Sequence, residues 1–183
     1  MIKRFRIILI ICLLLSAVKL FSQTDEYWVK GVFIEKITRF IEWPQGSKVN
    51  DVNKKFVISV IGDNPFAKKL NEIYKDTKIK NKQVELRYIN RISEIDGSDV
   101  LFICSNEKDM LTDILAFTKD KLILTLADSE GFGEGGVLIN FFIIDNKIKF
   151  EINETAVKAA GLMPSYMLLN LAKVVNPMKK YRR

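Results

Sequence analysis

The stretch LILTLADSEGFGEGGVLINF, residues 122–141, carries the glycine pattern G-x-G-x-x-G at Gly131, Gly133 and Gly136. In dinucleotide-binding folds these glycines turn the chain from a strand into a helix, whose N-terminus receives the pyrophosphate. Here the next residues, VLINFFII, are β-branched and aromatic, which predicts a strand instead. We therefore expect a glycine-rich connection between two strands, with positive φ angles at glycines, and no dinucleotide site.

Further stretches on both sides of this connection also read as strands. KFVISVIG (55–62), DVLFIC (99–104) and KLILTLA (121–127) are continuous apolar runs, typical of strands buried on both faces of a parallel sheet. QVELRYI (83–89) alternates apolar and charged residues, so one face of that strand is exposed. With helical stretches between them, these strands predict an α/β, Rossmann-like three-layer domain with a mostly parallel sheet and flanking helices.

The end of the domain is predicted as an antiparallel hairpin followed by helices. Two strands meet at Asp145-Asn146, a pair favoured in tight primed turns. In the second strand, charged residues alternate with apolar ones, as at an exposed sheet edge. A final helix is expected to restart at Pro164, and its apolar residues are interpreted as core: Met163, Met167, Leu168 and Leu171.

Three other helices are expected before the hairpin. Residues 26–44 place apolar side chains at helical spacing, with Lys30 off that stripe and Pro44 ending the helix. The second helix is expected to begin at Pro65, after Asn64 as its cap. The third is expected to be capped by Ser105 or Asn106.

The N-terminus has the features of an export signal. Basic residues at the start precede an apolar run, Ile7–Val18, and Ser22 is a small residue at which a signal peptidase can cut. The run is short for a membrane span, which needs about 20 apolar residues, and an uncleaved inner-membrane anchor is the alternative. We expect a signal peptide over residues 1–22, a periplasmic domain over 23–176 and a basic tail over 177–183.

The charge balance argues against a nucleic-acid partner. Residues 1–22 hold four basic and no acidic residues, so 29 − 4 = 25 basic and 22 acidic residues remain, a net charge of +3. The C-terminal MKKYRR supplies four of those positive charges, and the body without it is close to neutral. A surface of this kind lacks the basic excess that phosphate backbones require.

The residue inventory also argues against catalysis and metal binding. The chain has no histidine, and Cys104 is its one cysteine after residues 1–22. Ser-His-Asp and Cys-His catalysis, thiolate clusters and an intramolecular disulfide are therefore excluded. Asp128 and Glu130 flank the glycine connection, where such acids are usually solvated. We expect a non-enzyme with no metal and no cofactor, in which Cys104 is a buried core residue.

Several separated stretches, in order, share one further pattern. They are YWVKGVFIEKITRFIEWP, VISVIGDNPF, DVLFICSNE, LADSEGFGEGGVLINFF and KIKFEINETAVKAAGLMPSYMLLNLAKVV. They resemble the YfiR-like family of exported bacterial proteins, and the resemblance runs from about Tyr27 to Val175. Members of that family carry disulfides, which Cys104 alone cannot form, so redox control through a disulfide does not transfer to this chain.

The resemblance implies a periplasmic regulator that restrains a membrane-bound signalling receptor. The expected partner is a diguanylate cyclase or a sensor kinase, held through its extracytoplasmic domain; release of the hold raises cyclic-di-GMP and favours biofilm. An outer-membrane or other envelope protein and a homodimer are further expected contacts. Aromatic and displayed loop residues are the candidate contact points, because aromatics anchor interfaces disproportionately: Phe132 and Glu134 on the glycine connection, and Trp28 on the first helix.

The alternative is a periplasmic protein that senses a small molecule. In open parallel sheets, ligands sit beyond the carboxyl ends of the strands. That rule places the turns after two predicted strands beside one another at a cleft, and the candidate ligand-binding residues there are Asp63, Asn64, Ser105 and Asn106. Copurification with an inner-membrane protein would favour the regulator, and thermal stabilisation by a metabolite would favour the sensor.

Overall fold

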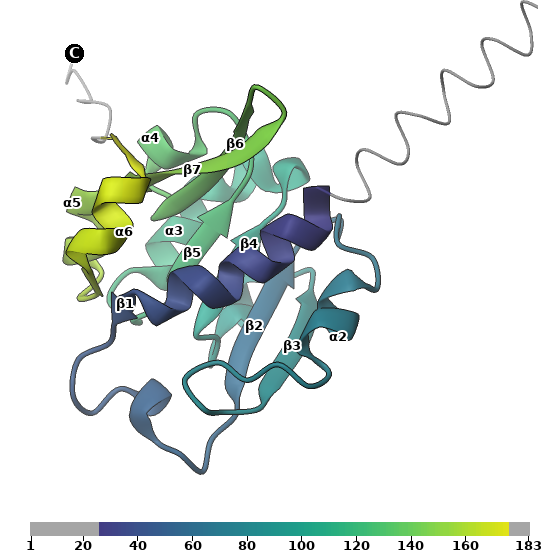
Figure 1. Ribbon diagram of the computed structural model, residues 1–183, viewed down its shortest axis with the longest axis vertical. Coiled ribbons are helices and arrows are strands. Elements are labelled where there is room, and N and C mark those ends of the chain that lie inside the picture. The colour runs from purple at the N-terminus through teal and green to yellow at the C-terminus, as the bar shows by residue number, and fades with distance from the viewer. Residues whose placement is uncertain (1–25, 176–183) are drawn as a thin grey trace, which may run out of the picture.

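The computed structural model describes residues 26–175, in which strands and helices largely alternate (Figure 1). A helix over residues 26–39 opens the described chain. The following elements, with η for a 3₁₀ helix, are β1 (Ile41–Glu42), η1 (Lys48–Asn50), β2 (Phe56–Ile61), α2 (Lys69–Tyr74), β3 (Val84–Ile89), η2 (Ile92–Ile95), β4 (Val100–Ile103), η3 (Ser105–Met110), α3 (Leu111–Thr118), β5 (Leu124–Ala127), α4 (Phe132–Gly135), β6 (Ile139–Ile144), β7 (Lys147–Asn153), α5 (Glu154–Ala159), β8 (Met163–Pro164), α6 (Tyr166–Leu171) and β9 (Lys173–Val175).

Seven strands form one sheet in the order β3-β2-β4-β5-β6-β7-β9. The strands β2 to β6 run parallel to their neighbours, β7 is antiparallel to β6, and β9 runs parallel to β7. The chain places β3 on one side of β2 and then β4 on the other side. The predicted mostly parallel α/β sheet with a C-terminal hairpin is therefore confirmed.

Helices cover both faces of this sheet. Ile34 and Ile37 of the first helix and Val157 of α5 belong to the core cluster on one face. Ile114 of α3 and Ile95 of η2 belong to the cluster on the other face. Figure 1 shows the first helix, in purple, crossing the sheet on the opposite side from α3. Two apolar layers on a central sheet give the expected three-layer arrangement.

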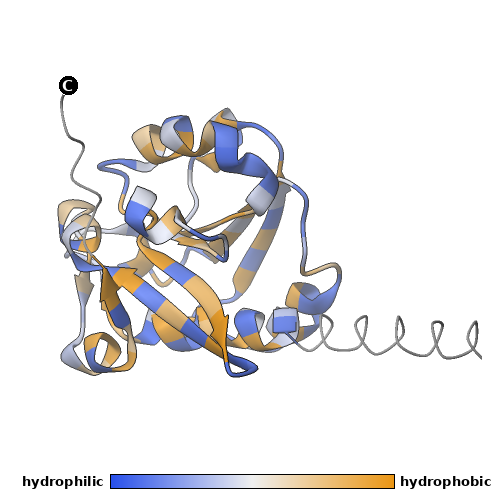
Figure 2. Cartoon of the chain, turned by 90° about the horizontal axis from the view of Figure 1, so that it is seen from above, coloured by the Kyte–Doolittle hydropathy of each residue, from blue (hydrophilic) through white to orange (hydrophobic). Residues whose placement is uncertain are grey.

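In the predicted strands, the burial of the residues follows the apolar pattern of the sequence. Every residue of β2 is buried, as its continuous apolar run predicts. Asp145 and Asn146 adopt φ angles of 50° and 55° at the β6–β7 turn, the left-handed conformation that a primed hairpin turn requires. Hydrophilic and hydrophobic residues alternate along β7, and the turn is hydrophilic (Figure 2). The second half of β7 is not an edge, however, because Glu151, Ile152 and Asn153 pair with β9.

Two helix starts differ from the prediction. Residues after Asn64 form turns rather than a helix, and α2 begins only at Lys69, because Ala67 takes a φ of 50° that a right-handed helix cannot include. The segment after Cys104 begins as the 3₁₀ helix η3, and regular α-helix starts at Leu111.

The end of the first helix also differs from the prediction. This helix ends at residue 39, before Pro44, because β1 pairs with β8.

The predicted final helix is shorter than expected. It spans Tyr166–Leu171 and is capped by Ser165 rather than started at Pro164, and the β-branched end of the described chain forms β9. Leu168 is buried as predicted, whereas Met163, Met167 and Leu171 are exposed, so their interpretation as core was wrong. Within residues 26–175 no helix combines the length and apolar character needed to cross a membrane. The expected signal peptide and basic tail lie outside the described residues.

Candidate functional site

Asp128, the first residue after β5, anchors the start of the first helix. Its carboxylate accepts a hydrogen bond from the Tyr27 hydroxyl at 2.8 Å and forms a salt bridge with Lys30 Nζ at 2.7 Å. Lys30 also pairs with Glu26, one helical turn earlier. Burial, and then the neighbouring Asp128 carboxylate, raise the pKa of the Tyr27 phenol. Its hydroxyl therefore stays protonated and donates a hydrogen bond to Asp128.

This cluster lies inside the protein rather than on its surface. The Lys30 side chain is 4% exposed and that of Asp128 is 8% exposed. A buried charge persists only when it is paired, and Lys30 has two carboxylates in contact. The expectation that Asp128 is a solvated loop acid was therefore wrong: the side chain turns inward to neutralise a lysine on the first helix.

A second polar group lies on β6 and β7, beside the first. The Asn140 side-chain amide donates to the Ser129 carbonyl at 2.9 Å and to Glu151 Oε1 at 3.0 Å. The other oxygen of Glu151 lies 3.4 Å from Lys173 Nζ on β9. A Cβ atom on Gly133 would lie 2.5 Å from Glu151 Oε1, so glycine lets α4 approach the Glu151 side chain on β7 without displacing it.

These two groups line one cavity of about 570 Å³, which we call the Asp128 pocket. It is bounded by the start of the first helix, the β5–α4 connection, the β6–β7 hairpin and β9. Its lining residues include Glu26, Lys30, Asp128, Glu130, Glu134, Asn140, Phe142, Ile143, Glu151 and Lys173. Its volume is within the range of small-molecule sites, about 300–1,000 Å³.

The three candidate partner-binding residues occupy different environments. Trp28 is 42% exposed, and Glu134 is exposed at the rim of the Asp128 pocket. Phe132 is only 2% exposed, because α4 turns its ring into the apolar cluster beneath β4 and β5. The expectation that Phe132 is displayed was wrong. Gly131 and Gly136 do have positive φ values, 79° and 116°, as predicted for the connection.

The candidate ligand-binding residues are brought together at the carboxyl ends of β2 and β4. Asn106 Oδ1 accepts a hydrogen bond from the Asp63 backbone N–H at 3.0 Å, which joins the two turns. Asn64 Oδ1 accepts from the Phe66 backbone N–H at 2.9 Å, and Asn106 Nδ2 donates to Glu107. Ser105 and Asp63 are exposed. These amides are thus engaged within the turns, and ligand binding there stays a prediction.

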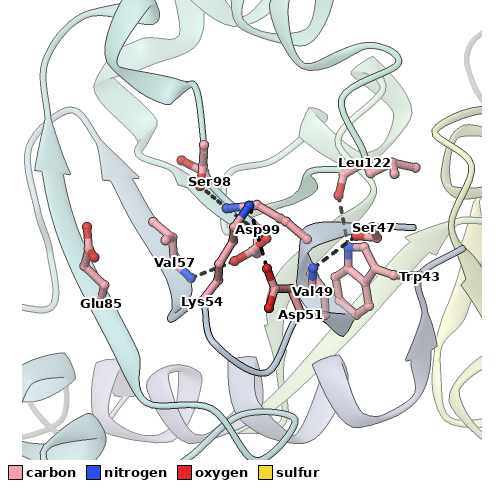
Figure 3. A network of polar contacts seen from close by, with 12 residues as sticks. Trp43, Ser47, Val49, Asp51, Lys54, Val57, Glu85, Ser98, Asp99 and Leu122 are labelled. Atoms are coloured by element: carbon pink, nitrogen blue, oxygen red, sulfur yellow. Dashed lines mark hydrogen bonds and ion pairs between the residues drawn. The ribbon is translucent and has the colours of Figure 1, made fainter. Parts of the chain in front are cut away.

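The opposite end of the parallel strands carries a structural network (Figure 3). Asp99, 1% exposed, accepts a hydrogen bond from the Val57 backbone N–H at 2.8 Å and lies 3.1 Å from Lys48 Nζ. The Trp43 ring nitrogen donates to the Leu122 carbonyl at 3.0 Å. These contacts hold the loop after β1 against the amino ends of the strands.

Cys104 is buried, as predicted. Burial, followed by nearby carboxylates, raises the pKa of its thiol to about 12, which keeps the thiol protonated near neutral pH. Among the described residues, no group of three or more acidic, cysteine or histidine side chains is arranged to hold a metal ion.

Comparison with known proteins identifies the family. The sequence pattern of the YfiR/HmsC-like family matches residues 27–173, which is most of the chain. The chain belongs to the YfiR/HmsC-like family. Membership places it in a family of periplasmic regulators linked to cyclic-di-GMP signalling. No curated protein sequence matches the chain.

Solved structures show the fold alone. The ABC domain from Streptococcus pneumoniae in complex with L-Trp matches with a TM-score of 0.51 at 12% identity, over 70% of this chain and 57% of that one. A conserved domain protein from Vibrio cholerae O1 biovar El Tor matches with a TM-score of 0.49 at 12% identity, over 67% of this chain and 55% of that one. This YfiR/HmsC-like chain therefore spans little more than half the length of either structure.

Proposed function

We propose that this protein is a periplasmic binding protein that restrains a membrane-bound signalling receptor, a diguanylate cyclase or a sensor kinase. It would act by holding the receptor's extracytoplasmic domain in its inactive state. The observation that carries the proposal is the match of the YfiR/HmsC-like family across residues 27–173, nearly the whole of the described domain. The export features of the N-terminal sequence agree with it.

An apolar surface on the described domain suits protein binding. It lies on β8, α6 and β9, and we call it the α6 surface; its residues are Met163, Tyr166, Met167, Leu171 and Val174. Tyr166 is 77% exposed and Leu171 is 67% exposed. Grouped apolar side chains at this level of exposure usually mark an interaction site, and tyrosine and methionine are enriched at such sites. Trp28 and Glu134 are a second candidate contact.

The proposed mechanism is a shift between two receptor states. A regulator that binds the inactive state better than the active one raises the inactive population by its difference in affinity, and a competitor reverses the effect. A ligand, or an outer-membrane or other envelope protein that occupies the same surface, would release the receptor. A homodimer through the α6 surface would also compete with the receptor for that surface.

A genetic experiment tests the function. The gene is deleted and the strain is complemented with the natural protein, with Met167→Glu or with Glu72→Gln, an exposed position on α2 that serves as control. Cyclic-di-GMP and the phosphorylation of envelope sensor kinases are then measured. We expect deletion to activate one of these outputs, and Met167→Glu, unlike Glu72→Gln, to fail to restore it. Unchanged outputs after deletion would refute the proposal.

Sensing a small molecule is the second candidate function, and the Asp128 pocket is the observation that favours it. The pocket is large enough for a metabolite and combines charged groups with the apolar residues Phe142 and Ile143. The two functions are compatible, because a periplasmic regulator needs an input signal. Binding of a metabolite that leaves the receptor unaffected would favour a separate sensing role.

A further inference from the structure

The β6–β7 hairpin projects beyond the rest of the sheet as a two-stranded ribbon. β5 pairs only with Ile139 and Asn140 of β6, and β9 pairs only with residues 151–153 of β7. Among the described strands, residues 141–150 therefore pair only with each other. Figure 1 shows this ribbon at the top of the molecule. A ribbon of two strands is marginally stable in water unless something packs against it.

The tip of this ribbon is apolar on both faces. The run FFII, residues 141–144 of β6, has no polar residue, and successive side chains of a strand point to opposite faces. Such a run is typical of a strand that is buried on both sides. Here Ile143 is 51% exposed and Ile144, on the other face, is 52% exposed. Exposed apolar side chains grouped in this way mark a surface that another surface covers.

The apolar tip continues onto the start of the first helix. Val29 and Phe33 of that helix line one hollow together with Ile143 and Ile148 of the ribbon. Val29 is 39% exposed, and Trp28, the residue before it, is 42% exposed. We call this region the hairpin surface; its residues are Trp28, Val29, Phe33, Ile143, Ile144 and Ile148.

The hairpin surface lies beside the point where the chain leaves its N-terminal apolar run. The link of residues 19–25 follows the run Ile7–Val18, and the first helix begins at residue 26. Fully extended, that link spans at most about 25 Å. While the run occupies the membrane, during export or as a retained anchor, the start of the first helix and the ribbon beside it stay close to the bilayer.

The charges at the tip favour an anionic lipid surface. Lys147 and Lys149 of β7 are exposed, and neither forms a salt bridge with another described residue. Asp145 is the one acidic residue of the ribbon over 141–150. Lysines next to apolar side chains lay their stems along that surface and reach lipid phosphates with their ammonium groups. On the free edge of β7, the same lysines disfavour pairing with a strand of a second copy.

We propose that the hairpin surface binds an anionic lipid bilayer, on the side where the N-terminal run emerges, as a peripheral membrane contact. Ile143 and Ile144 enter the boundary between headgroups and acyl chains, as the apolar face of an interfacial segment does. Lys147 and Lys149 contact the lipid phosphates. Trp28 lies at the level of the headgroups, where tryptophan is enriched. This inference does not rest on the proposed regulatory function.

Vesicle flotation of the purified chain from residue 23 onward tests the lipid contact. This chain folds without the N-terminal run, because both core clusters lie within the described residues. The vesicles contain phosphatidylcholine and phosphatidylglycerol in a ratio of about 2:1. We expect the protein to float with them. The double variant Ile143→Ser/Ile144→Ser should bind about tenfold or more weakly, because two apolar side chains no longer leave water.

The matched control is Val52→Ser, because Val52 is a β-branched side chain that is 85% exposed. It lies in the loop before β2, at the amino end of the parallel strands, whereas β6 runs past their carboxyl end. Val52→Ser should bind vesicles as the natural protein does. Both variants should keep the urea midpoint of the natural protein, since all three positions are exposed, and a loss of binding then does not reflect unfolding.

A second double variant, Lys147→Gln/Lys149→Gln, tests the charge of the tip. We expect it to bind the anionic vesicles about tenfold more weakly than the natural protein does, because two cations next to the headgroups are lost. Its weak binding to vesicles of phosphatidylcholine alone should match that of the natural protein. Salt at about 1 M should reduce the binding of the natural protein to anionic vesicles to the level of this variant.

Tryptophan fluorescence reports whether the hairpin surface itself enters the bilayer. The chain has two tryptophans, and Trp43 is only 8% exposed, so a change of solvent affects Trp28. On addition of anionic vesicles, the emission of the natural protein should shift to shorter wavelength. The Trp28→Phe variant should show no shift. An equal shift in that variant would contradict the assigned surface.

Three results would overturn the proposal. The first is no flotation with lipid at about 1 mM. The second is equal flotation of the natural protein and Ile143→Ser/Ile144→Ser. The third is a dimer in solution that this double variant abolishes while no vesicle binds, which would assign the hairpin surface to a second copy. Each leaves the regulator proposal intact, because receptor control is tested through Met167→Glu, and unchanged signalling outputs after gene deletion would leave the lipid contact intact.

Discussion

Replacing Lys30 by methionine tests whether the Asp128 cluster stabilises the fold. The substitution keeps an unbranched side chain and removes only the ammonium group from a site that is 4% exposed. Asp128 is then left 8% exposed with the Tyr27 hydroxyl as its remaining partner. The matched control is Lys158→Met on α5, because Lys158 pairs with Glu154 in the same i, i+4 arrangement but is 64% exposed.

The expected magnitude follows from burial. Removing one member of a buried ion pair costs about 3–5 kcal/mol, because the other charge stays buried without compensation. We expect about 3 kcal/mol for Lys30→Met, since Tyr27 still donates to Asp128 and Glu26, 23% exposed, can regain water. For a domain of this size that free energy corresponds to a fall in Tm of about 6–12 °C. The exposed Lys158 pair should contribute less than about 0.5 kcal/mol.

Urea unfolding followed by circular dichroism measures both variants. The slope of the unfolding free energy against urea should not change, so the difference appears in the midpoint. If the free energy of unfolding of Lys30→Met lies within about 0.5 kcal/mol of that of the natural protein, the Lys30 charge contributes nothing to the stability of the folded state, and the buried cluster does not stabilise the fold. A large loss in Lys158→Met would equally contradict the argument from burial.

Four other predictions concern three separate parts of the chain. Met167→Glu on the α6 surface should change the free energy of unfolding by less than about 0.5 kcal/mol, yet abolish restoration of receptor control in the deletion strain. Asp99→Ala should lower the free energy of unfolding by about 2–3 kcal/mol in urea titrations, because the Val57 N–H and Lys48 lose a buried carboxylate. The Cys104 thiol, with its pKa raised to about 12, should react with a disulfide reagent at pH 8 only after urea unfolds the protein. Since that thiol ionises in the unfolded chain at lower pH than in the folded one, the natural protein should lose stability relative to Cys104→Ala as pH rises above about 9.

The strands and their order in the chain could be predicted because they depend on local pattern. β2, β4 and β5 are predominantly apolar and are buried along their whole length, and the Asp145-Asn146 turn has residues that tolerate left-handed backbone. β9 was missed because its formation depends on pairing with β7, a contact distant in sequence. Its β-branched residues, in KVV, were the available signal.

The candidate site was predicted only in part, because side-chain direction is set by tertiary packing. Adjacent strand ends predicted the meeting of Asp63 and Asn106, which a hydrogen bond confirms. The prediction that Phe132 is exposed was wrong because it took the whole glycine-rich segment to be exposed. Removing a phenylalanine ring from water is favourable, and the structure buries this one. Nothing in the local sequence identifies Asp128 as the partner of a lysine 98 residues earlier.

Photo-crosslinking in living cells tests directly whether the protein contacts a membrane-bound receptor through the α6 surface. A photoreactive residue is placed at Met167 on the α6 surface, and at Glu72 on α2 as the matched control; after irradiation the adducts are identified by mass spectrometry. We expect an adduct between position 167 and the extracytoplasmic domain of a membrane-anchored diguanylate cyclase or sensor kinase, with none from position 72. Adducts from position 167 only to a second copy of this chain, with the protein well expressed in the periplasm, would contradict it.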